Sequence, residues 1–96
     1  MAKFTVRVVL HKIKNLDHDS YTKLHVAMEA ANFKRYIESE DAAYQLPPAE
    51  YNYIGSKSRE EVREEASAIA TKIDVDSGVL VTEGVRVWSG LKKVDL

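Results

Sequence analysis

Three histidines are the residues best suited to acid–base or metal chemistry, because an imidazole ionises near neutral pH and binds transition metals. They are His11, His18 and His25. His18 and His25 are separated by about 10 Å along a helix axis, which is too far for both to bind one ion. The sequence also lacks an HExxH motif. We therefore interpret the histidines as surface or half-buried side chains.

One acidic segment has a superficial likeness to a calcium loop. Asp74 and Asp76 precede Gly78, but an EF-hand needs an oxygen ligand at the fifth position of the loop and glutamate at the twelfth. Those positions hold Gly78 and Val85 here. Cysteine is absent from the chain, which excludes thiolate metal sites and cysteine nucleophiles. We expect no metal site and no cofactor.

The stronger candidates for binding are cationic and aromatic side chains in strand-like segments. They are Arg7, His11, Tyr51, Tyr53, Arg86 and Trp88. If an open sheet face collected them, they would offer stacking surfaces beside positive charge, which is how some sheets hold single-stranded RNA. The same residue types dominate protein–protein interfaces, so a homodimer or a host-protein partner explains them equally well. The alternation of polar and apolar residues along the strands does not decide which face of the sheet carries Tyr51, Tyr53 and Trp88.

The element that must position these side chains is the stretch from Phe4 to His11, FTVRVVLH. Its alternation predicts a central strand that is buried on one face and chemically mixed on the other. The buried face would carry Phe4, Val6, Val8 and Leu10. The open face would carry Arg7, Val9 and His11.

Two helices are predicted from apolar residues at helical spacing. The first begins after Asp17 or Asp19 and ends near Ala31, with Asn32 as a left-handed stop. The second begins at a capping box, in which Ser58 and the glutamate three residues later can each bond a free amide of the other. Its apolar stripe comprises Val62, Ala66, Ile69, Ala70 and Ile73.

Further strands are predicted at 33–38, 50–54, 79–82 and 85–88. Pro47 and Pro48 interrupt the extended segment between 43–46 and 50–54 because proline cannot donate a ladder hydrogen bond. Glu83-Gly84 favours a hairpin between the last two strands, although a single strand bulged at Gly84 would give a similar pattern. The order predicts an α+β, ferredoxin-like βαββαβ fold, an antiparallel four-stranded sheet with both helices on one face and an optional short C-terminal strand.

Composition limits the class of protein. A chain of 96 residues supports a single hydrophobic core, so we expect one domain over 1–96. The net charge of −1 argues against a general trap for nucleic acid or anionic membrane, although it allows a local basic patch. The chain has no apolar run near the roughly 20 residues that cross a bilayer. We expect a cytoplasmic protein without a membrane partner.

Five segments are informative when taken together: VRVVLH, YTKLHVAMEAANFKRYI, LPPAEYNY, SREEV and VLVTEGVRVW. They resemble a family of small bacterial and prophage proteins grouped with the GhoS type V antitoxin. The resemblance implies a ferredoxin-like fold akin to the small CRISPR adaptation nuclease, and an antitoxin that cleaves its toxin's mRNA. Those nucleases place a metal-binding aspartate after the first strand, where this chain has His11 and no acid before Asp17.

Metal-independent RNA cleavage would need a general base, a general acid and a cation near one phosphate. His11 and Arg7 can supply one acid–base group and the cation, but the sequence shows no second group. We therefore expect an RNA-directed protein of the endoribonuclease-antitoxin type, with single-stranded RNA as its partner and its catalytic residues unassigned. The alternative is a non-enzymatic interaction module, either a homodimer or a phage-encoded binder of a host protein.

Overall fold

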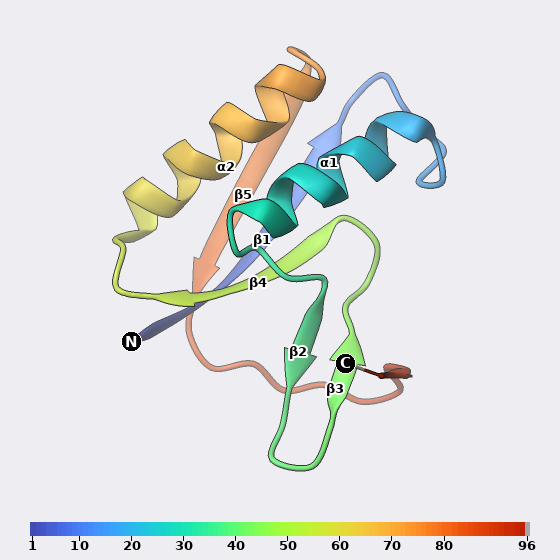
Figure 1. Ribbon diagram of the computed structural model, residues 1–96. Helices are drawn as coiled ribbons and strands as arrows, with labels where there is room; N and C mark the ends of the chain where they lie inside the picture. The colour runs from blue at the N-terminus through green and yellow to red at the C-terminus, as the bar shows by residue number, and fades with distance from the viewer. Residues whose placement is uncertain (96) are drawn as a thin grey trace.

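A computed structural model describes residues 1–95 as a mixed α+β protein with two helices and two small antiparallel sheets (Figure 1). The elements in chain order are β1 (Ala2–Leu10), α1 (Asp19–Ala30), β2 (Tyr36–Glu38), β3 (Ala43–Gln45), β4 (Glu50–Gly55), α2 (Arg59–Ile73), β5 (Ser77–Glu83) and β6 (Lys93–Val94). The predicted α+β class is confirmed. Neither helix is both long and apolar enough to cross a membrane.

The first sheet has the strand order β4-β1-β5, so the predicted central strand is central. Val6 lies opposite Tyr51 on β4 and Val81 on β5, and directly opposed residues of antiparallel strands share a face. The predicted alternation along β1 is confirmed. Its buried residues are Phe4, Val6, Val8 and Leu10.

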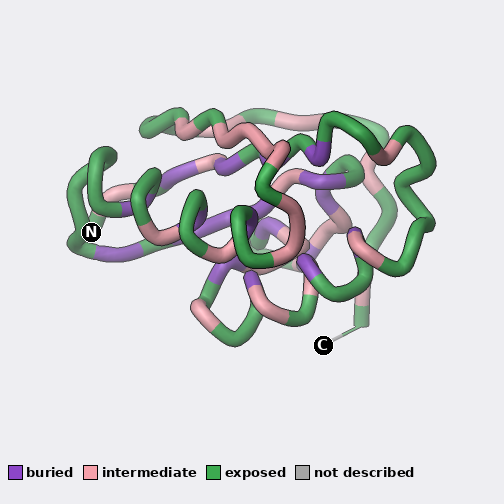
Figure 2. Tube along the Cα trace, turned by 90° about the horizontal axis from the view of Figure 1, so that it is seen from above, coloured by how far each residue is buried: buried purple, intermediate pink, exposed green. Residues whose placement is uncertain are grey.

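Both helices cover the buried face of this sheet (Figure 1). Tyr21, Leu24 and Met28 of α1 join Val62, Ala66 and Ala70 of α2 in one hydrophobic cluster with the buried residues of β1. Figure 2 shows the buried residues concentrated along the strands and recurring on the helix turns. Burial of these apolar surfaces is the main favourable contribution to folding.

The helix ends follow local chemistry closely. Ser58 and Glu61 form both bonds of the predicted capping box, at 2.9 and 3.1 Å. The residue that caps α1 is His18, whose Nδ1 accepts from the backbone N–H of Ser20 at 3.1 Å, in place of the expected aspartate. Asn32 has a φ of 69°, so the predicted left-handed stop is confirmed.

The predicted four-stranded sheet is wrong in its strand count. The second sheet has the order β2-β3-β6, and the backbone of the segment before β2 pairs with the first sheet through an isolated bridge between Lys34 and Asn52. Pro47 and Pro48 separate β3 from β4, and Ala49 adopts a φ of 65°. Because this turn redirects the chain, β3 pairs with β2 and β6 instead of continuing the first sheet.

The predicted hairpin at the C-terminal end is also wrong. β5 runs without interruption to Glu83, and residues 85–88 form no strand. Gly84 has a φ of 147°, a conformation that residues with a side chain rarely adopt, and the chain turns away from the strand there. The optional short C-terminal strand is present as β6, paired with β3.

Candidate functional site

Arg7 and His11 lie where the alternation predicts, on or beside the open face of the first sheet. Both side chains are exposed. Arg7 is directly opposite Glu50 on β4 and Leu80 on β5, while His11 follows the end of β1 with its ring beside Gly78. Both side chains therefore remain accessible to a ligand on this face.

The two tyrosines are on the other side of the sheet, which corrects the expectation that they would stack on a ligand beside Arg7. Tyr51 is 0% exposed and Tyr53 is 8% exposed. They oppose Val6 and Phe4, which fixes them on the helix-covered face. A buried ring cannot stack on an RNA base, so the open face lacks the predicted aromatic surface.

Arg86 and Trp88 lie in the irregular segment after Gly84, not on the predicted strand. The Arg86 guanidinium donates to the Phe4 carbonyl at 2.8 Å, to Thr5 Oγ1 at 3.2 Å and to Asn52 Oδ1 at 2.7 Å. Burial lowers the pKa of Arg86 from its usual value. These bonds fasten residues 84–88 across the open face, so the Arg86 donors have a structural role.

Trp88 packs against Tyr44 of β3, with ring centroids 5.9 Å apart. Its half-buried ring joins the irregular segment to the second sheet. Of the six predicted binding residues, only Arg7 and His11 therefore remain together on an accessible surface that could meet RNA.

A different cluster of reactive groups lies on the helix side, around His25 of α1. His25 Nδ1 is 2.6 Å from the hydroxyl oxygen of Tyr51 on β4. The neighbouring Tyr21 hydroxyl accepts from the Leu10 N–H at 3.0 Å. α1 is thereby fixed to the sheet by two tyrosine hydroxyls, one of which holds the imidazole of His25.

The His25–Tyr51 hydrogen bond determines which imidazole nitrogen is free. The Tyr51 hydroxyl is buried, and burial raises its pKa, so it keeps its proton at neutral pH. His25 Nδ1 is its only hydrogen-bond partner among residues 1–95. We infer that the hydroxyl donates to Nδ1, which leaves Nε2 as the ring nitrogen that a ligand can reach.

Charged residues surround His25 and affect its ionisation. Burial lowers the pKa of His25 below 6.5, the nearby Arg35 lowers it further, and Glu29 opposes both effects. Glu29 lies four residues after His25 on α1, and residues at that spacing are neighbours on one helix face. The imidazole is therefore mostly neutral at pH 7, with an anion and a cation near it.

A surface cavity of about 290 Å³ brings these groups together. It is lined by Thr22, His25, Val26, Glu29 and Arg35. A neutral imidazole, a carboxylate, a guanidinium and a hydroxyl around one cavity are suited to binding an anion and transferring a proton. Within the described part of the chain, no group of three or more potential metal ligands is found.

The sequence contained a partial signal for this cluster. The His25–Glu29 spacing places both on one helix face, but nothing in the chain showed that Tyr51 would reach His25 from β4. The interpretation of the three histidines as surface or half-buried residues agrees with the exposure of each one. It gave no indication that one of them lines a polar cavity.

Comparisons of the chain with protein-family models, with curated proteins and with solved structures found no match in any of the three.

Proposed function

We propose that the protein is an RNA-directed enzyme, a metal-independent endoribonuclease whose base is His25. The observation that carries the proposal is the cavity shared by His25, Glu29 and Arg35, with Tyr51 holding the imidazole. In this cavity His25 would act first as the base and then as the acid, and Arg35 would be the cation. Arg7 lines a separate cavity with Val9, Gly78, Val79 and Leu80, and His11 is not among its lining residues.

The proposed reaction is an internal transfer of the phosphoryl group. For this step His25 uses its other neutral tautomer, in which the Nδ1–H donates to the Tyr51 oxygen and Nε2 carries a free lone pair. Nε2 then takes the proton of a ribose 2′-hydroxyl, whose oxygen attacks the adjacent phosphorus. The bond to the 5′-oxygen breaks, and the imidazolium returns the proton to that oxygen. The products are a 2′,3′-cyclic phosphate and a 5′-hydroxyl end. Arg35 stabilises the charge on the phosphoryl oxygens, and Glu29 stabilises the imidazolium.

The test is cleavage of a mixed single-stranded RNA pool at low salt in the presence of EDTA. A general base contributes about 10²- to 10⁴-fold, so His25→Gln should slow cleavage at least about 100-fold. His11→Gln is the matched control and should leave the rate unchanged. A pool with 2′-deoxyribose should resist cleavage, because the nucleophile is missing.

Two results would contradict the proposal. If the wild-type protein cuts no RNA in the pool, the activity is absent. If cleavage survives His25→Gln and Arg35→Gln but fails in Arg7→Ala, the site lies on the open face instead. Salt-sensitive RNA binding that weakens in Arg7→Ala would assign the open face to binding.

We also propose that the chain is a variant of the ferredoxin-like fold. The order β4-β1-β5, the helices on one face and the Lys34–Asn52 bridge beside β4 support this, since the bridge occupies the place of a fourth strand. Membership of the GhoS-like antitoxin family is part of the same proposal. It would make a toxin's mRNA the substrate and the cytoplasm the site of action.

A further inference from the structure

The outer edge of β5 has no partner strand among residues 1–95, and the register between β1 and β5 fixes which of its backbone groups point outward. The Gly84 N–H donates to the Lys3 carbonyl, and the His11 N–H donates to the Asp76 carbonyl. Residues of β5 alternate between groups that point toward β1 and groups that point away. The N–H and C=O groups that point away belong to Ser77, Val79, Val81 and Glu83.

The two edges of the first sheet differ. At the β4 edge, the Lys34 backbone covers Asn52 with two hydrogen bonds of 2.7 and 2.8 Å. At the β5 edge, no strand among residues 1–95 pairs with the side of β5 that faces away from β1. Natural edge strands are protected by lysine, proline, a bulge or a covering segment, and SGVLVTE contains neither lysine nor proline. This edge is open for pairing with another strand.

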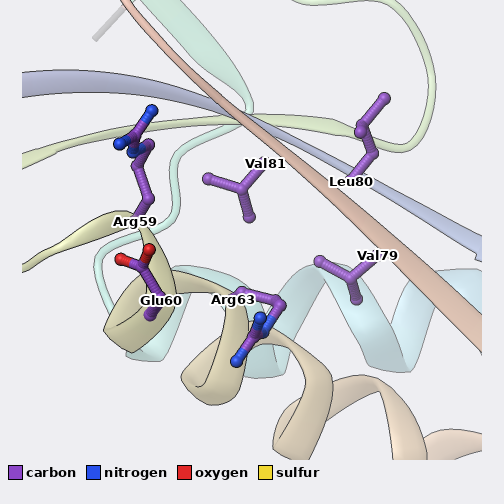
Figure 3. A pocket seen from close by; sticks show the side chains of 6 residues that line it. All are labelled: Arg59, Glu60, Arg63, Val79, Leu80 and Val81. Carbon is purple, nitrogen blue, oxygen red and sulfur yellow. The ribbon is translucent and has the colours of Figure 1, made fainter.

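The same edge is apolar on both faces. Leu80 is 63% exposed on the open face of the sheet, and Val79 and Val81 point toward α2 (Figure 3). A groove of about 360 Å³ runs between the strand and the start of α2. It is lined by Arg59, Glu60, Arg63, Val79, Leu80 and Val81. An apolar strand edge beside a groove is a surface that a second β-strand can cover.

We propose that a second copy of this chain covers the edge, with the two β5 strands antiparallel about a twofold axis through Leu80. Leu80 is the middle residue of β5, and Val79-Leu80-Val81 reads the same in both directions. In this register Ser77 opposes Glu83 of the second copy, and Val79 opposes Val81 of the second copy. All the outward-pointing backbone groups of β5 then gain partners, and the two Leu80 side chains meet on the axis.

Charge is compatible with a second copy as the occupant. Glu83 is the one charged residue of β5, and it contacts Arg59 of its own chain at 3.5 Å. In the proposed register Glu83 lies opposite the uncharged Ser77 of the second copy, so no like charges oppose each other between the two β5 strands. This interface does not depend on the proposed RNA cleavage.

The first test is the molar mass of the full chain by sedimentation equilibrium over a range of concentrations. We expect a dimer whose dissociation constant rises about 100-fold in Leu80→Lys. The dimer withdraws two Leu80 side chains from water, and each one lowers the dissociation constant about tenfold. Val87→Lys is the matched control, an exposed valine outside β5, and should leave the constant unchanged. A wild-type mass that stays monomeric at every concentration would overturn the proposal.

The second test checks the register. The chain has no cysteine, so a single one can be introduced without side reactions. Leu80→Cys would put two thiols directly opposite each other, at a separation of about 4.5 Å between Cα atoms that suits a disulfide. Thr82→Cys is the control on the same strand and face, and its two copies lie far apart in this register. Equal cross-linking of the two variants would overturn the Leu80-centred pairing.

Discussion

Tyr51→Phe is the substitution that tests the His25 cluster most directly. The change removes one hydroxyl oxygen and keeps the ring that fills the core beside Val6. It deletes the 2.6 Å bond to His25 Nδ1, and a hydrogen bond of this kind contributes about 0.5–1.5 kcal/mol to stability. At pH 8 we expect a loss of about 1 kcal/mol. For a domain of this size, that lowers Tm by about 4–8 °C.

The pH dependence of that loss identifies the donor. The pKa of His25 in the folded protein lies below its usual 6.5. The neutral imidazole therefore adds stability that is present above pH 6.5 and is lost as the pH falls through the folded pKa. Once protonated, Nδ1 can no longer accept from the Tyr51 hydroxyl, and the buried hydroxyl hydrogen is left without an acceptor. The cost of Tyr51→Phe should consequently shrink between pH 8 and pH 5.

Urea unfolding followed by circular dichroism measures this cost at each pH. Tyr21→Phe is the matched control, because its hydroxyl accepts from the backbone N–H of Leu10, which does not titrate. Its cost of about 1–3 kcal/mol should stay constant over the same range. A Tyr51→Phe cost that is constant, or that grows on acidification, would refute the inferred direction of the His25 hydrogen bond.

Two further predictions concern the elements that frame these surfaces. Arg86→Ala should lower the free energy of unfolding by about 1.5–3 kcal/mol, because it removes charged hydrogen bonds to Phe4, Thr5 and Asn52. Trp88 fluorescence should shift to the red as residues 84–88 leave the sheet. Unchanged fluorescence would mean that other contacts hold the segment. Ser58→Ala should cost about 1 kcal/mol through loss of the α2 cap, measured by thermal unfolding, whereas Ser67→Ala, exposed in the middle of α2, should cost little. Equal effects of the two serine variants would argue against the cap as the cause.

Several parts of the fold could be predicted because their causes are local. The buried face of β1 follows from strict alternation, since successive side chains of a strand point to opposite faces. The start of α2 follows from Ser58 and Glu61, which satisfy each other's free amides within three residues. The end of α1 at Asn32 also has a local cause, because asparagine tolerates the positive φ found there.

Other parts depended on contacts between residues distant in the sequence. Whether residues 85–88 pair with β5 is decided by Arg86, whose hydrogen bonds to β1 and β4 hold that segment across the sheet. The strand count is decided by the turn at Pro47–Ala49, which diverts β3 into a separate sheet. Pro47 and Pro48 mark the interruption in the sequence, but which strands then pair with each other has no signature within a short window.

For the chemistry, the sequence by itself determined which reactive groups exist and that Arg7 and His11 lie on the side of β1 away from the core. Only the tertiary structure decided that Tyr51 faces the helices and bonds His25 across 26 residues, and that Arg35 lines the same cavity. The reason is that strand alternation fixes relative faces but not which face the helices cover. That choice depends on the burial of the whole apolar surface at once.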